Sequence, residues 1–145
     1  MTDHYAADIK AIEALIDTMF RSITWSPQAA PDWDGFAAPC LDEALLIPAS
    51  RPAKPTTVQP FVAMMQKQRD DGNLVDFEEH TIGHHVRVFG NTAIAMSSFA
   101  TRINKGDERR GVNAFMLVKT EDRWRIAAMC WDNESADHAL PADLA

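Results

Sequence analysis

The chain has 145 residues and carries 14 lysines and arginines against 21 aspartates and glutamates, which gives a formal net charge of −7. A chain of this size normally folds around one core, so we expect a single domain over residues 1–145, with an ordered core from about residue 5 to 134 and a C-terminal tail over 135–145. The negative charge, without any basic stripe to offset it, argues against nucleic acid and anionic membranes as partners.

The N-terminus and the cysteines bear on the cellular compartment. No apolar run approaches the roughly 18 residues of a membrane-spanning helix, and Asp3 and Asp8 stand where a signal peptide would be basic. We therefore expect a cytoplasmic protein. In that compartment Cys40 and Cys130 are expected to remain free thiols.

The N-terminal segment has a helical pattern. Between residues 5 and 23, apolar side chains recur at spacings of three and four, with charged residues between them. This periodicity predicts a long amphipathic helix. Thr2 or Asp3 is placed to cap its free N–H groups.

The next segment alternates breaks with short elements. Residues 26–39 contain three prolines together with Trp33 and Phe36, which predicts a lid-like loop or short helix whose aromatic rings need cover. Residues 41–48 then indicate a short strand. A second helix is predicted from Thr56 or Thr57 to the stop signal at Gly72.

The rest of the chain is predicted to be strands, and its first hairpin turns at Gly90-Asn91. Folding the chain about this turn places the following pairs on one mainly apolar face: Val88 with Ala93, Val86 with Ala95, His84 with Ser97, Ile82 with Phe99, and His80 with Thr101. The same register places Glu79 opposite Arg102 on the other face, where their charges complement each other.

A second hairpin is predicted about Glu121-Asp122. Its inward pairs are Leu117 with Ile126, Phe115 with Ala128, Asn113 with Cys130, and Gly111 with Asp132. The opposite face of this hairpin is also apolar, and helices can cover only one side of a sheet. We therefore expect a homodimer that forms through the face of Met116, Met129 and Trp131.

The amino-acid sequence of these hairpins resembles that of a known superfamily. The segments VFGNTAIAMSSF at Val88–Phe99 and RRGVNAFMLVKTEDRWRIAAMCWDNE at Arg109–Glu134, with the order of the predicted elements, resemble the nuclear transport factor 2-like superfamily and its SnoaL-like, polyketide cyclase-like domains. The matching residues are Arg110, Gly111, Val112, Asn113, Phe115, Leu117, Trp124, Arg125, Ile126, Trp131 and Glu134. The resemblance implies an α+β fold of the cystatin-like type, a cone-shaped and strongly curved antiparallel sheet packed on N-terminal helices.

The inward face of the predicted sheet collects the side chains of a ligand pocket, because it is apolar with a few converging polar groups. The expected ligand-binding residues are Trp33, Phe36, Phe99, Asn113, Phe115 and Cys130. The alternative is that Asn113 and the nearby histidines are hydrogen-bonded core residues, and that Cys130 is a small apolar filler.

A histidine beside an aspartate can act as a general base. His80 or His84 with Asp132 is the expected catalytic pair, against structural or ligand-orienting roles for the same residues. A metal is not expected, since residues four apart on a strand are separated by roughly 13 Å, too far for His80 and His84 to share an ion. No cofactor is expected either.

The resemblance implies no single activity, because the superfamily contains ketosteroid isomerase-like and dehydratase-like enzymes, polyketide cyclases and protein-binding transport factors. We expect the pocket to bind a small hydrophobic molecule with a carbonyl or hydroxyl group. An enzyme of this kind would be a cofactor-free isomerase, cyclase or lyase acting on a hydrophobic carbonyl compound. The alternative is a non-catalytic module for ligand binding, protein interaction or dimerisation.

Overall fold

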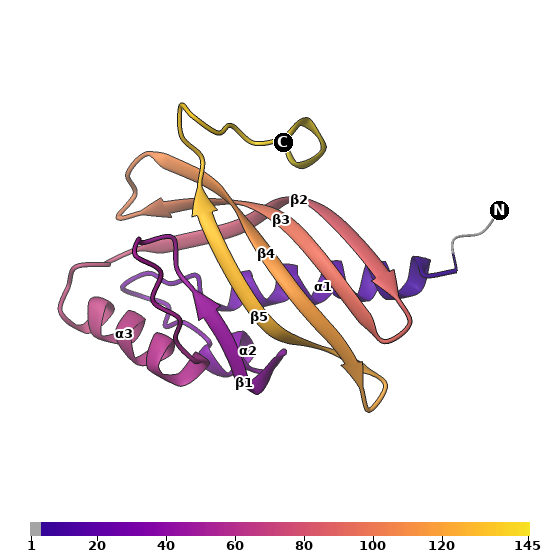
Figure 1. The fold of residues 1–145 in the computed structure, drawn as a ribbon. Helices are drawn as coiled ribbons and strands as arrows, with labels where there is room; N and C mark the ends of the chain where they lie inside the picture. Colours follow the sequence, from indigo (N-terminus) through magenta and orange to yellow (C-terminus); the bar gives the residue numbers. More distant parts are fainter. Residues whose placement is uncertain (1–3) are drawn as a thin grey trace.

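In the computed structural model, which describes residues 4–145, most of the sheet comes from the second half of the chain (Figure 1). The strands are β1 (Cys40–Ile47), β2 (Phe77–Phe89), β3 (Thr92–Ile103), β4 (Glu108–Thr120) and β5 (Arg123–Asn133). Their order in the sheet is β1-β5-β4-β3-β2. The last four form an antiparallel meander, whereas β1 pairs with β5 in parallel. The predicted α+β class and curved sheet are confirmed, but the sheet is mixed at its β1 edge.

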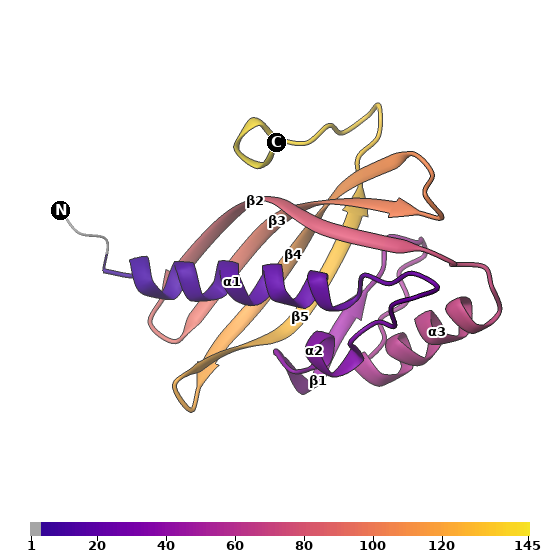
Figure 2. The same ribbon diagram turned by 180° about the vertical axis from the view of Figure 1, so that it is seen from behind.

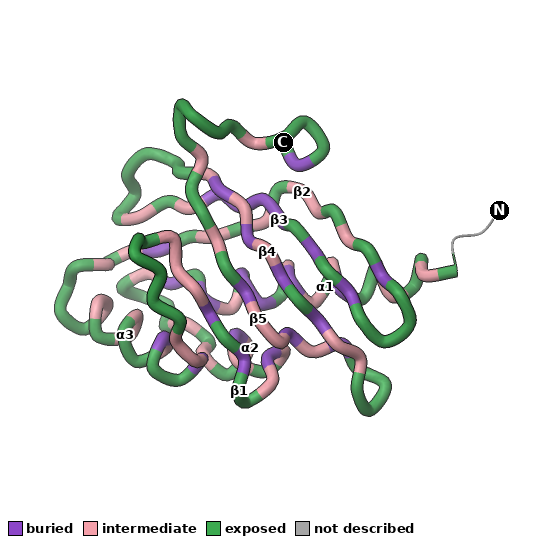
Figure 3. Tube along the Cα trace, in the orientation of Figure 1, coloured by how far each residue is buried: buried purple, intermediate pink, exposed green. Residues whose placement is uncertain are grey.

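The helices cover one face of this sheet (Figure 2). They are α1 (Ala6–Ser22), α2 (Trp33–Ala37) and α3 (Val58–Asp70). The apolar stripe of α1 becomes core, since Ile12, Ile16 and Met19 are fully buried. The caps predicted at Thr2 or Asp3 lie outside the described residues. Buried positions alternate with less buried ones along the strands, and the turns and loops are mostly exposed (Figure 3).

Both hairpin turns lie where the sequence predicts them. Gly90 has a φ of 57°, and Glu121 and Asp122 have φ values of 52° and 60°, the left-handed conformation of tight hairpin turns. Close to each turn the predicted register is confirmed: Val88 pairs with Ala93, Val86 with Ala95, His84 with Ser97, and Leu117 with Ile126.

Farther from each turn a β-bulge shifts the register by one residue. In β2 the irregularity falls between Thr81 and His84, so that Thr81, not Ile82, pairs with Phe99. Glu79 therefore pairs with Thr101, and the predicted pairs of Thr101 with His80 and of Arg102 with Glu79 are wrong. A single extra residue in one strand moves every side chain beyond it to the opposite face of the sheet from the one predicted.

The hairpin of β4 and β5 contains the second bulge. Its Met116 pairs with Ala128 and Leu117 with Ile126, which leaves Ala127 as the extra residue of β5. Beyond this point the observed pairs are Phe115 with Met129, Asn113 with Trp131, and Gly111 with Asn133. The predicted partners Ala128, Cys130 and Asp132 are each displaced by one position. As a result, Met129 and Trp131 turn inward while Cys130 and Asp132 turn outward.

The C-terminal tail packs back onto the sheet. After β5 it crosses to the strand at the other edge of the meander and ends in a short 3₁₀ turn, η1 (Ala142–Leu144) (Figure 1). Leu144 is buried, and its carbonyl accepts a hydrogen bond from the Ser98 hydroxyl. Glu134 anchors the start of the tail, because it accepts bonds from the Leu140 N–H and from the Arg110 guanidinium, which together lower its pKa. Residues 135–145 thus belong to the folded unit.

None of the helices within residues 4–145 combines the length and the apolar character that crossing a lipid bilayer requires.

Candidate functional site

An apolar pocket of about 280 Å³ lies between the sheet and the helices, near the C-terminal ends of α1 and β5. Its walls are mainly aromatic and aliphatic: α1 and the residue that follows it supply Phe20 and Ile23, α2 supplies Phe36, and α3 supplies Phe61 with Met64 and Met65. The sheet supplies the opposite wall, including Phe99, Met129 and Trp131. Such a cavity, apolar with few polar groups, is typical of a small-molecule site.

Ring contacts hold the pocket in shape. Phe61 stacks on Phe36 with ring centroids 5.7 Å apart, and it meets the edge of Trp131 at 5.8 Å. These contacts connect α2, α3 and β5 around the cavity. Aromatic pairs in such geometries stabilise beyond the area they bury, so the walls are fixed before any ligand arrives.

Glu79 is the unexpected member of the pocket. The bulge in β2 turns its side chain inward among apolar residues, where the sequence register had placed it outside. Burial raises the pKa of this carboxyl to about 8, and the nearby Asn113 amide, which favours the charged form, offsets only part of that shift. At neutral pH Glu79 is therefore mostly a neutral carboxylic acid.

Asn113 lies beside Glu79 in the wall of the pocket and is 2% exposed. Its Nδ2 atom is buried and has no partner at hydrogen-bond geometry among the described residues. Buried polar atoms are nearly always paired in folded proteins. An unpaired amide donor next to a protonated carboxyl is suited to a ligand oxygen.

Arg109 supplies the remaining ionisable group of the pocket lining within the described chain. Thr101 on β3 pairs with Glu79 on one side and with Arg109 on the other, so the three residues form one row across β2, β3 and β4. Glu79 is half-buried at one end of this row, whereas Arg109 at the other end is exposed to solvent. The pocket thus has a neutral interior and a positive group at its entrance.

The predicted ligand-binding residues divide between wall, core and surface. Phe36, Phe99 and Asn113 line the pocket. Phe115 is buried core behind the wall, with its ring 6.3 Å from that of Phe20. Trp33 packs against Phe36 from outside the cavity, and its indole N–H donates to Gln66 at 2.6 Å. Cys130 is exposed on the outer face because of the bulge in β5.

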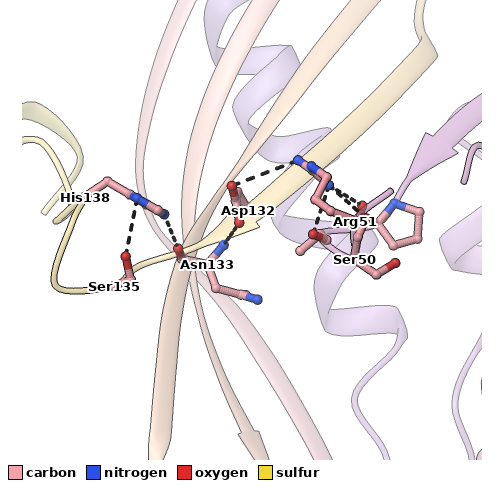
Figure 4. Close-up of polar contacts among 8 residues, drawn as sticks. Ser50, Arg51, Asp132, Asn133, Ser135 and His138 are labelled. Carbon is pink, nitrogen blue, oxygen red and sulfur yellow. Dashed lines mark hydrogen bonds and ion pairs between the residues drawn. The ribbon is translucent and has the colours of Figure 1, made fainter. Parts of the chain in front are cut away.

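The predicted pairing of a histidine with Asp132 is not formed. Asp132 points away from the cavity, toward Arg51 at 4.0 Å, and also accepts the N–H of Asn133 at 2.8 Å (Figure 4). The histidine drawn in this view, His138, contacts the Asn133 carbonyl and not Asp132. The cause is again the one-residue shift of β5, since the prediction gave Asp132 the inward position that Asn133 occupies.

The two predicted histidines lie outside the pocket. His80 is exposed. His84 is held under α1, where its Nε2 contacts the Asp17 carboxylate at 2.9 Å and its Nδ1 contacts the Ser97 hydroxyl at 2.7 Å. Asp17, His84 and Ser97 are bonded in the order of a catalytic triad, but Ser97 is fully buried and does not line the apolar pocket. The hydrogen bonds of His84 attach α1 to the bulged part of β2.

Only one of the three residues predicted for the dimer face lies on the outer face of the sheet. Met129 is 3% exposed and Trp131 lines the pocket, so neither lies on the outer surface. Met116, in contrast, is 58% exposed and does lie there. The strands instead place Met116 beside Ile94, with Met96, Leu45 and Ala128 around them. We call the set of Leu45, Ile94, Met96 and Met116 the outer patch.

Within residues 4–145 we find no group of three or more histidine, cysteine, aspartate or glutamate side chains that could hold a metal ion.

Comparison with known proteins places the fold. No protein-family model matches the sequence, and no curated protein is significantly similar to it. Solved structures are similar: the chain has the cystatin-like, nuclear transport factor 2-like fold. The predicted fold type is therefore confirmed.

Particular neighbours share this fold at low sequence identity. A protein of unknown function from Mycobacterium tuberculosis is 19% identical with a TM-score of 0.70, over 96% of this chain and 80% of that one. A nuclear transport factor 2-like protein of unknown function from Pseudomonas putida is 14% identical with a TM-score of 0.69, over 96% of each chain. A candidate scytalone dehydratase from Novosphingobium aromaticivorans is 15% identical with a TM-score of 0.68, over 99% of this chain and 95% of that one.

Proposed function

We propose that the pocket binds a small hydrophobic molecule with a carbonyl or hydroxyl group, and that Glu79 exchanges a proton with it. The observation that supports this proposal is a neutral carboxyl inside an apolar cavity, beside the unpaired Nδ2 of Asn113. Strongly shifted carboxyl groups in cavities are candidates for acid–base chemistry.

The two groups have complementary roles in this proposal. Asn113 donates a hydrogen bond to the oxygen of the ligand, which stabilises negative charge that develops there. Glu79, with its pKa raised to about 8, donates its proton to a leaving hydroxyl, or accepts one from the carbon next to a carbonyl once it is ionised. The protein would then be a cofactor-free isomerase, cyclase or lyase. The candidate scytalone dehydratase among the structural neighbours supports the lyase form.

Proton transfer can be tested without knowing the natural substrate. The protein is expected to accelerate exchange of the α-protons of 2-tetralone with deuterium oxide, followed by proton NMR. Glu79→Gln is expected to lower this acceleration about 100-fold or more, since a positioned acid or base typically contributes that much. Glu78→Gln is the matched control, because this neighbouring carboxyl is exposed on the other face and should leave exchange unchanged.

Two results would separate catalysis from binding. Wild-type exchange rates in Glu79→Gln would remove Glu79 from the chemistry. Tight binding of 2-tetralone without any acceleration would favour the non-catalytic alternative. Met65→Trp places a larger side chain at the α3 wall and should weaken binding in either case, because Met65 lines the cavity and is only partly buried.

We further propose that the chain forms a homodimer through the outer patch. Ile94 and Met116 pair directly across β3 and β4 and are 60% and 58% exposed, which leaves apolar surface uncovered at the centre of a sheet face. A second copy presents the same uncharged patch, so a two-fold contact is self-complementary without ion pairs.

The dimer is tested by sedimentation equilibrium at micromolar concentration. A variant with both Ile94→Lys and Met116→Lys is expected to sediment as a monomer, because two like charges would face their copies across the interface. Val75→Lys is the control, since Val75 is an exposed apolar residue outside the outer patch. A monomeric wild-type protein would contradict the proposal.

A further inference from the structure

Arg109 is a free cation at the entrance of the pocket. Its side chain is exposed and lines the cavity, and it has no ion pair or side-chain hydrogen bond among residues 4–145. Neighbouring arginines are already engaged, Arg110 with Glu134 and Arg102 with Glu108. Arg109 therefore differs from them in being available to a ligand.

The position of Arg109 relative to Glu79 sets the reach of such a ligand. The two residues flank Thr101 on either side, and all three line the pocket. Two strand spacings separate β2 from β4, so the backbones of Glu79 and Arg109 are about 10 Å apart. A molecule whose reactive oxygen lies at Glu79 and Asn113 can extend an opposite end to the guanidinium.

We propose that the ligand of this pocket is an apolar carboxylic acid, and that Arg109 binds its carboxylate at the entrance. This inference rests on the proposed function and specifies its substrate class. A guanidinium matches a carboxylate through two parallel hydrogen bonds. Among residues 4–145, Arg109 is the single cation of the lining, which suits a singly charged carboxylate better than a phosphate. The walls behind it suit an aliphatic or aromatic body.

The buried carboxyl is compatible with an anionic ligand. A charged Glu79 would repel a carboxylate brought into the same cavity, but burial raises its pKa to about 8 and keeps it neutral at pH 7. The positive entrance thus acts on the ligand without an opposing charge inside the pocket. Thr101, between the two residues, is polar but uncharged.

The test compares two probes that differ in one charge, 2-naphthylacetate and 2-naphthylacetamide, by isothermal titration at pH 7. The wild-type protein is expected to bind the acid about tenfold more tightly than the amide, the scale of a charge-assisted pair at a partly exposed site. Arg109→Gln should reduce binding of the acid to the level of the amide and leave the amide unchanged. Arg109→Lys should recover part of the difference.

Arg102→Gln is the matched control, because Arg102 is an exposed arginine at the same end of the sheet that does not line the pocket. It should keep the preference for the acid. Equal binding of acid and amide by the wild-type protein would overturn the inference while the proposed pocket stands. A preference that survives Arg109→Gln, or is lost equally in Arg102→Gln, would also overturn it. Binding of neither probe would overturn the pocket as a ligand site and this inference with it.

Discussion

Glu79→Gln is expected to make the protein more stable than the wild type at pH 8.5, and about equally stable at pH 4. The pKa of Glu79 is about 8 in the folded chain against 4.5 for the free side chain. Between these values the folded state binds the proton and the unfolded state releases it, so the free energy of unfolding falls as pH rises. The variant has no proton to lose there and lacks this decline.

The size of the effect follows from the shift. The difference between about 8 and 4.5 is some 3.5 pKa units, and each unit is worth about 1.4 kcal/mol, which sets an upper limit of about 5 kcal/mol above pH 8. Urea denaturation of both proteins at steps from pH 4 to pH 8.5 measures it. Glu78→Gln should decline with pH as the wild type does. A Glu79→Gln curve parallel to the wild-type curve would show that the carboxyl is ionised in the folded protein.

This cost connects stability with function. A carboxyl that only stabilised the fold would gain a strong partner, as Glu134 does with Arg110. Glu79 has no such cation in the described chain, and its neighbour Asn113 keeps a free donor. Groups held in an unfavourable environment are typical of binding and catalytic sites, where the arrangement needed for activity lowers the stability of the fold. The pH dependence of unfolding and the exchange reaction therefore report on the same side chain.

The sequence predicts the elements well because each carries a local signal. The apolar spacing of α1, the turn at Gly90-Asn91 and the turn at Glu121-Asp122 all act over a few residues. The register close to each turn follows from the turn itself. The faces beyond the bulges do not, since they depend on where an extra residue is accommodated.

The two bulges differ in how visible they are. In β2 a signal is present, because Gly83 stands inside a strand and such a glycine often marks a bulge or a close approach. The structure contains both: Gly83 lies at the register shift, and its N–H donates to the Ser98 hydroxyl at 3.0 Å. A bulge at Gly83 places Glu79 on the inner face of the sheet.

The bulge at Ala127 leaves no comparable trace. The hairpin of β4 and β5 is apolar on both faces, so alternation of polar and apolar residues does not tell the inner from the outer side. The predicted register therefore places Cys130 and Asp132 at the inward positions that Trp131 and Asn133 occupy. The bulge in β5 thus separates Asp132 from the pocket and moves Met129 and Trp131 away from the outer face, whereas the bulge in β2 accounts for the outward position of His80.

Gly111→Ala is expected to destabilise the protein by about 3 kcal/mol or more, an effect at the upper end for a single methyl group in a packed core. Gly111 is buried in β4, and a Cβ at this position would run into the backbone carbonyl of Asp132 and the ring of Phe99, closer than side chains approach in folded proteins. The backbone of β5 cannot yield without breaking its ladder with β4. Urea denaturation of the wild type and the variant measures the loss.

Gly90→Ala is the control for this substitution. Gly90 has a positive φ of 57° and nothing within 4 Å of the added Cβ, so only the backbone preference of about 1 kcal/mol is at stake there. A Gly111→Ala variant no worse than Gly90→Ala would contradict the tight packing of Phe99 on β4. Because Phe99 forms part of the pocket wall, the same methyl group should also weaken binding of 2-naphthylacetamide. Gly111 thus has a steric role: it makes room for the ring of Phe99, which lines the same cavity as Glu79.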